Sequence, residues 1–72
     1  MKFSDGHEVY SQGETFGIDE DLSVSQGWDG VFSDPVDTLP IHGSDEYMTK
    51  KHAVELADRM ILLWQKYREK WA

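Results

Sequence analysis

The last third of the chain is an unbroken stretch of good helix formers, and it limits what the rest can fold into. Residues 49–71 contain neither glycine nor proline, and Thr49, with Ser44 as an alternative, is suited to be the helix N-cap. Apolar residues recur at alternating spacings of four and three, which is typical of an amphipathic helix. This stripe consists of Ala53, Ala57, Met60, Trp64, Tyr67 and Trp71; Leu56 and Leu63 widen it on one side, and Val54 and Ile61 lie at the other edge. We therefore expect one helix over residues 49–71.

The predicted helix is long compared with everything else that a chain of this size can build. At about 1.5 Å per residue it spans roughly 34 Å, whereas a strand of about four residues covers about 13 Å. The 72 residues include no cysteine, so the core is small and has no disulfide to support it. The outer part of the stripe, around Trp64, Tyr67 and Trp71, is therefore a candidate exposed patch that meets another chain.

Residues 2–33 read as short β-strands separated by turns. The turn signals are Asp5-Gly6, which favours a type I′ hairpin, then residues 11–13, the acidic run 19–21 and residues 27–30. Between these turns, polar and apolar residues alternate, which is typical of half-buried strands. The sequence therefore predicts a small antiparallel β-meander over residues 2–33.

Residues 34–48 contain both prolines, Pro35 and Pro40. Each proline removes a backbone donor and favours extended geometry in the residue before it, so we interpret this segment as a linker that lies over the surface. The complete prediction is a single α+β domain of residues 1–72. In this domain the β-meander leads through the linker to the helix, which packs across one face of the sheet.

Charge is distributed unevenly along the chain. Residues 1–48 carry eleven acidic residues and one basic residue, a net charge of −10, whereas residues 49–72 carry six basic and three acidic residues, a net charge of +3. The acidic part repels nucleic acid and anionic membranes and attracts a basic protein surface. Direct nucleic-acid binding is therefore disfavoured, although a small DNA-binding regulator that uses the basic helix stays an alternative.

The acidic side chains also suggest a way to bind a partner. Carboxylates spread over one surface imitate a phosphate backbone and attract a basic nucleic-acid-binding protein; the alternative is that they only keep a small protein soluble. The residues expected to form this acidic face are Asp19, Glu20, Asp21, Asp29, Asp34 and Asp37.

The sequence shows no recognisable catalytic or metal-binding motif. His7, His42 and His52 do not have the spacing of ligands on one helix, and we expect His52 to be solvated in the first helical turn. The run from Asp19 begins like a calcium loop but has Val24 where glycine is required. The prediction is a non-enzymatic protein without a cofactor or metal; a zinc site assembled from the three histidines is the alternative.

The C-terminal run from Val54 to Lys70 resembles the tail of small accessory proteins encoded by tailed bacteriophages of actinobacteria. The similarity lies in a leucine-alanine-aspartate stretch (residues 56–58), a bulky apolar pair, a tryptophan and a basic-aromatic tail. The upstream runs at residues 3–6 and 27–30 are also similar. This resemblance implies a phage or prophage origin and an accessory role, and it transfers no site residue.

Together these features predict a protein-binding module that binds and modulates a host or defence protein, for example as an inhibitor. The contact surface is the acidic face, the helix face formed by Met60, Trp64, Tyr67 and Trp71, or both. The alternative is a virion or assembly component that forms a homo-oligomer through the helix. The absence of cysteine fits a reducing cytoplasm. Because no apolar run has the length of a membrane span or the pattern of a secretion signal, we expect a cytoplasmic location.

Overall fold

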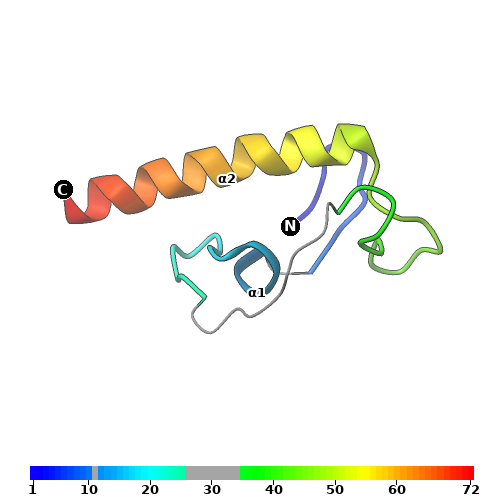
Figure 1. Cartoon of the computed structure of the whole chain (residues 1–72), viewed down its shortest axis with the longest axis horizontal. Helices are drawn as coiled ribbons and strands as arrows, with labels where there is room; N and C mark the ends of the chain where they lie inside the picture. Colours follow the sequence, from blue (N-terminus) through cyan, green and yellow to red (C-terminus); the bar gives the residue numbers. More distant parts are fainter. Residues whose placement is uncertain (11, 26–34) are drawn as a thin grey trace.

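The computed structural model of the chain describes residues 1–10, 12–25 and 35–72. These residues form two helices, α1 (Gln12–Phe16) and α2 (Lys50–Trp71), which are connected by loops and turns. α2 runs along one side of the molecule, and α1 and the loops lie together on the other side (Figure 1). The molecule measures 41 × 28 × 18 Å, and α2 lies along its longest dimension.

α2 confirms the predicted C-terminal helix and its N-cap. The Thr49 hydroxyl oxygen accepts a hydrogen bond from the backbone N–H of His52 at 3.3 Å, and Thr49 N–H donates to the His52 ring at 3.2 Å. This reciprocal pair is a capping box, which satisfies two backbone donors that the first helical turn leaves free. At the other end, Arg68 and Lys70 lie in the last turn, where the helix dipole favours positive charge.

The buried line of α2 lies along one side of the predicted apolar stripe, the side widened by Leu56 and Leu63. The buried residues of α2 are His52, Leu56 and Leu63, whereas Ala57 and Trp64 of the stripe are exposed. Around residues 60–64 every side chain is apolar, so apolar periodicity does not select which line of the helix faces the core.

Three tight loops, each closed by a single antiparallel bridge, shape most of the remaining described backbone. They are loop 1 (residues 2–8), loop 2 (residues 18–24) and loop 3 (residues 40–47). In loop 1, Phe3 N–H donates to His7 O at 2.7 Å and Gly6 N–H donates to Phe3 O at 3.0 Å. Loop 2 repeats this pattern, with Leu22 at the position of Gly6 and a positive φ of 68°. A leucine in this conformation costs about 1–2 kcal/mol.

The predicted β-meander over residues 2–33 is wrong. In the described part of this range the bridges are isolated and no strand forms. α1 occupies residues for which a turn and a strand were predicted. It ends at Phe16 and is followed by Gly17, whose φ of +99° suits the residue after a helix C-terminus. Alternation over four or five residues does not distinguish a strand from one helical turn. The predicted turn at 27–30 and the strand after it lie outside the described residues.

The turn at Asp5-Gly6 is present but has a different geometry from the predicted type I′ turn. The hydrogen bonds place Ser4 and Asp5 at the centre of the turn, and Gly6 follows in the left-handed region at φ +88°. This is the pattern of a three-residue hairpin connection, in which glycine takes the left-handed position. The backbone therefore presents the Asp5 side chain at the tip of loop 1.

The core is assembled from residues that flank the loops and from one face of α2. Its buried hydrophobic members among the described residues are Phe3, Val9, Ile18, Ile41, Met48, Leu56 and Leu63. Loops 1 and 3 are held together by a hydrogen bond from His42 N–H to Glu8 O at 2.7 Å. The segment predicted as a surface linker therefore contributes two of these seven side chains, Ile41 and Met48. Within the described residues, neither helix combines the length and the apolar composition that a membrane crossing requires.

We expect Leu56→Ala to lower the free energy of unfolding by about 2–5 kcal/mol, because it leaves a cavity between α2 and the loops. Val54→Ala on the same helix is the matched control, since Val54 is 62% exposed, and it should change stability by less than about 0.5 kcal/mol. Urea unfolding followed by circular dichroism measures both. Equal losses for the two variants would contradict the packing of α2 described here.

Candidate functional site

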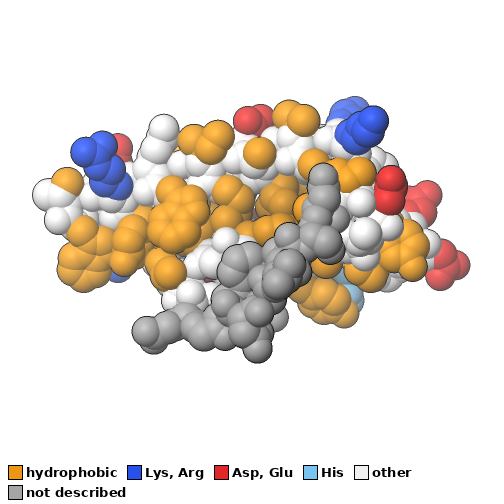
Figure 2. Space-filling view, in the orientation of Figure 1, with side chains coloured by type: hydrophobic (Ala, Val, Ile, Leu, Met, Phe, Trp, Pro, Cys, Tyr) orange, Lys and Arg blue, Asp and Glu red, His pale blue; other side chains and the backbone are white. Residues whose placement is uncertain are grey.

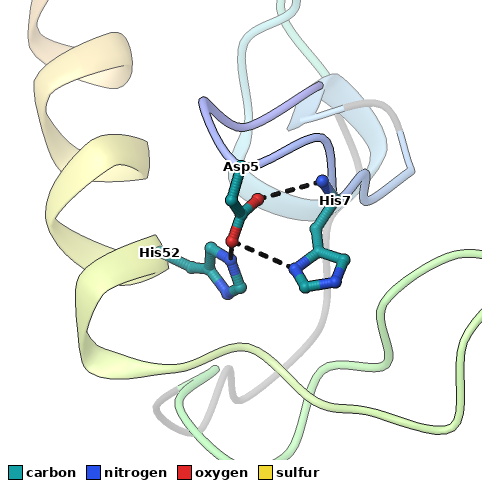
Figure 3. Close-up of side chains that lie close together, drawn as sticks. All are labelled: Asp5, His7 and His52. Atoms are coloured by element: carbon teal, nitrogen blue, oxygen red, sulfur yellow. Dashed lines mark hydrogen bonds and ion pairs between the residues drawn. The ribbon is translucent and has the colours of Figure 1, made fainter.

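The tip of loop 1 meets the first turn of α2 through a cluster of three titratable side chains, Asp5, His7 and His52 (Figure 3). Asp5 Oδ2 lies 2.6 Å from His52 Nε2 and 3.0 Å from His7 Nδ1. Asp5 and His52 are 47 residues apart in the sequence. The fold therefore joins two distant segments through one carboxylate oxygen.

Loop 1 holds Asp5 in place through its own backbone. The second carboxylate oxygen, Oδ1, accepts a hydrogen bond from His7 N–H at 2.9 Å, which is the local bond that aspartate makes at turns. Together with the hydrogen bond from His52, this bond lowers the pKa of Asp5 from 3.8 to about 2. The Asp5 carboxylate is therefore ionised at neutral pH.

His52 is held from both sides of its ring. Its side chain is buried, and the ring packs against Phe3 with the ring centroids 4.5 Å apart. Because Thr49 N–H points at Nδ1, this nitrogen accepts a hydrogen bond, and Nε2 carries the hydrogen of the neutral ring. Nε2 therefore donates to Asp5, and the capping box of α2 orients the imidazole toward loop 1. The expectation that His52 is solvated is wrong.

His7 connects the cluster to loop 3. Its Nδ1 faces Asp5, and its Nε2 lies 3.3 Å from Glu46 Oε2. Each ring nitrogen of His7 thus faces a carboxylate oxygen, and a protonated ring donates to both. The His7 side chain is 39% exposed, so the cluster is open to solvent on the His7 side while His52 closes it on the core side.

A second contact fastens loop 1 to α2 beside the cluster. Ser4 N–H donates to Glu55 Oε1 at 3.0 Å, and the Ser4 hydroxyl together with this N–H lowers the pKa of Glu55. Glu55 and Asp5 therefore both accept hydrogen bonds across the interface between loop 1 and α2.

The cluster of Asp5, His7 and His52 can do two things chemically. It fastens loop 1 to α2, and it offers two imidazole nitrogens and a carboxylate oxygen as ligands.

The predicted acidic face is only partly assembled among the described residues. Glu20 forms an ion pair with Arg59 of α2, with 3.4 Å between Oε1 and a guanidinium nitrogen. Asp21 accepts hydrogen bonds from Ser23 N–H at 2.9 Å and from its hydroxyl group, which lower the pKa of Asp21. Asp19 is half-buried and Asp37 is exposed in a separate turn. Asp29 and Asp34 lie outside the described residues.

The predicted helix face divides into a packed part and an exposed part. Met60 packs against the core, and Leu63 is the last buried residue of α2. Beyond it, Trp64 contacts Tyr67 edge to face with ring centroids 5.7 Å apart, and Tyr67 contacts Trp71 at 6.4 Å. Figure 2 shows hydrophobic side chains along α2 as far as its C-terminal end.

Sequence reasoning missed the cluster of Asp5, His7 and His52. The signals were present separately: a turn at Asp5-Gly6, a histidine directly after it, and a histidine three residues after an N-cap threonine. A capping box usually has glutamate or glutamine at this third position, so a histidine there is easily overlooked. Only the packing of loop 1 against α2 joins these signals.

Comparisons with models of protein families, with curated proteins and with solved structures found no match to this chain. The resemblance to phage accessory proteins therefore stays a prediction from the residues quoted above. The site has to be interpreted from its own chemistry.

The lowered pKa of Asp5 predicts a loss of stability in acid. A carboxyl whose pKa falls on folding stabilises the fold fully above its unfolded value of 3.8, and this contribution disappears as the pH falls to about 2. We therefore expect the unfolding free energy of the unsubstituted protein to fall more steeply between these pH values than that of Asp5→Asn. Urea unfolding across this range measures the difference, with exposed Asp58→Asn as control. Parallel curves for the unsubstituted protein and Asp5→Asn would contradict the assignment.

Proposed function

We propose that this chain is a non-enzymatic protein-binding module whose contact surface is the aromatic end of α2, formed by Trp64, Tyr67 and Trp71. The observation that carries the proposal is the exposure of two tryptophans at the end of one helix, 42% for Trp64 and 68% for Trp71. Tryptophan and tyrosine are the side chains that most often dominate binding energy at protein interfaces.

The neighbouring charges indicate the chemistry of the partner. Lys66, Arg68 and Lys70 surround the aromatic end and are exposed, and Glu69 is the acidic residue among them. The Lys70 ammonium also lies 5.2 Å from the Trp71 ring centroid, within cation–π range. A partner that fits this surface has an apolar cleft rimmed by carboxylates. The resemblance to phage accessory proteins suggests that the partner is a host or defence protein.

The aromatic end of α2 has better support as a contact surface than the acidic face. At the acidic turn, Glu20 is paired with Arg59, and the Asp21 carboxylate is engaged by Ser23. Binding a basic partner there has to compete with these contacts. In contrast, Trp64 and Trp71 are both exposed even though they contact Tyr67.

The test begins with a photo-crosslinking amino acid at position 67, which captures a protein bound to the aromatic end in living cells. The captured protein is then purified, and calorimetry gives its Kd for the unsubstituted chain and for Trp64→Ala/Trp71→Ala. We expect the double substitution to weaken binding at least about 30-fold, because a single interface hot spot contributes about 2 kcal/mol or more. Val54→Ala is the control, since Val54 is an exposed apolar residue on the same helix.

Light scattering of the purified chain separates this proposal from the homo-oligomer alternative. A monomer that binds the crosslinked protein supports the proposal. A defined oligomer that dissociates on Trp64→Ala/Trp71→Ala assigns the aromatic end to self-association instead. Unchanged partner affinity in the double variant would refute the proposed contact surface.

A further inference from the structure

We propose that Asp5, His7 and His52 form a binding site for a divalent transition-metal ion, with Zn²⁺ as the ion that fits best. Asp5 Oδ2, His7 Nδ1 and His52 Nε2 are the ligand atoms, and Glu46 holds His7 from outside. This site lies at the N-terminal end of α2 and is independent of the proposed protein-binding surface at its C-terminal end.

The positions of the three donor atoms support this site. They all lie within 4.8 Å of one another, and they belong to two segments that the fold brings together (Figure 3). Ligand bonds of about 2.0–2.2 Å in a tetrahedral zinc site place neighbouring ligand atoms about 3.3 Å apart. From the observed distances of 2.6 and 3.0 Å, Asp5 Oδ2 has to separate from the two nitrogens by less than about 1 Å.

The ligand types select the class of ion. Two imidazole nitrogens and one carboxylate oxygen suit zinc and related transition metals, whereas magnesium and calcium prefer ligand sets made of oxygen atoms. Asp5 and His7 are partly exposed, so an ion reaches the site from solvent, and water completes the coordination. Three protein ligands and an open position are a common zinc arrangement.

Glu46 supplies the outer contact that histidine ligands usually have. When a histidine binds a metal through one ring nitrogen, its other N–H is usually donated to a carboxylate or carbonyl oxygen. With His7 Nδ1 on the metal, Nε2–H donates to Glu46 Oε2, which lies 3.3 Å away. Loop 3 therefore orients a ligand that loop 1 carries.

His52 has to change its tautomer when the ion binds. In the metal-free chain its Nε2 carries the hydrogen and Nδ1 accepts the bond from Thr49 N–H. Coordination through Nε2 requires that this hydrogen leaves Nε2 and that the neutral ring carries a hydrogen on Nδ1 instead. Thr49 N–H then loses its acceptor and faces the new Nδ1–H, so these two donors, now 3.2 Å apart, have to separate. Metal binding thus exchanges one capping hydrogen bond for a metal bond and leaves a spectroscopic signature.

A bound ion would cross-link loop 1 to α2 in a chain that has no cysteine. Metal ligands that assemble only in the folded chain couple metal binding to folding, so that the ion raises the midpoint of thermal unfolding. The N-terminal loop and the C-terminal helix are held together here by few polar contacts, and the ion adds a bond at that junction.

The test is a titration of the chelator-treated protein with ZnCl₂, followed by calorimetry and thermal unfolding. We expect one ion per chain and a rise in Tm for the unsubstituted protein. His7→Gln should bind at least about 100-fold more weakly, since loss of a ligand exceeds the 10–100-fold effect of losing an outer contact. Glu46→Gln should fall within that 10–100-fold range. His42→Gln is the matched control, because His42 is exposed and lies outside the cluster, and it should bind like the unsubstituted protein.

Two spectroscopic measurements make the result independent of stability. Co²⁺ in place of Zn²⁺ should give visible absorption bands that His7→Gln loses and His42→Gln keeps. Nitrogen NMR of the imidazole rings should show the His52 hydrogen moving from Nε2 to Nδ1 on addition of Zn²⁺. Absence of one-to-one binding, equal affinity of His7→Gln and His42→Gln, or a His52 tautomer unchanged at saturating Zn²⁺ would each overturn the proposal.

Discussion

The hydrogen bond between Asp5 and His52 is the contact on which the arrangement of this small molecule depends. It joins the tip of loop 1 to the first turn of α2 at 2.6 Å, and the same imidazole completes the capping box that starts the helix. The start of the helix and the docking of the N-terminal segment are therefore supported by one side chain. Because Phe3 lies directly against the His52 ring, the polar junction is continuous with the hydrophobic core.

The two ends of α2 have different environments, and this difference underlies both proposals. The N-terminal half carries the buried contacts of His52 and Leu56 with the loops. Beyond Leu63, α2 carries exposed tryptophans and no fully buried side chain. A helix with one end integrated into a core and the other end free can present a rigid aromatic surface without a large scaffold. The polar cluster lies at the integrated end, where a bound ion would add to the rigidity of the module.

The uneven distribution of charge is used partly within the molecule. The acidic turn of loop 2 faces α2, where Glu20 pairs with Arg59. The pKa of Asp21 is lowered first by its hydrogen bonds from Ser23, and Lys70 adds the smallest contribution. Each exposed ion pair stabilises the fold by only about 0–1 kcal/mol, but such pairs reduce the negative charge that the acidic part offers to other molecules. The acidic face therefore stays a prediction, and part of its negative charge is balanced within the molecule.

The sequence by itself determined the elements whose causes are local. Thr49 and the run of helix formers after it specify α2, and Gly6 allows the left-handed residue that ends the turn of loop 1. The predicted meander failed because strands need partners at a distance, and a pattern of four or five residues is equally compatible with the single turn of helix in α1. Tertiary structure alone decided which side of the predicted stripe, that of Leu56 and Leu63, faces the core and that His52 is buried against Phe3. It also brought together Asp5, His7 and His52, because that meeting depends on how loop 1 packs against α2, and packing between segments 47 residues apart leaves no periodic trace in either of them.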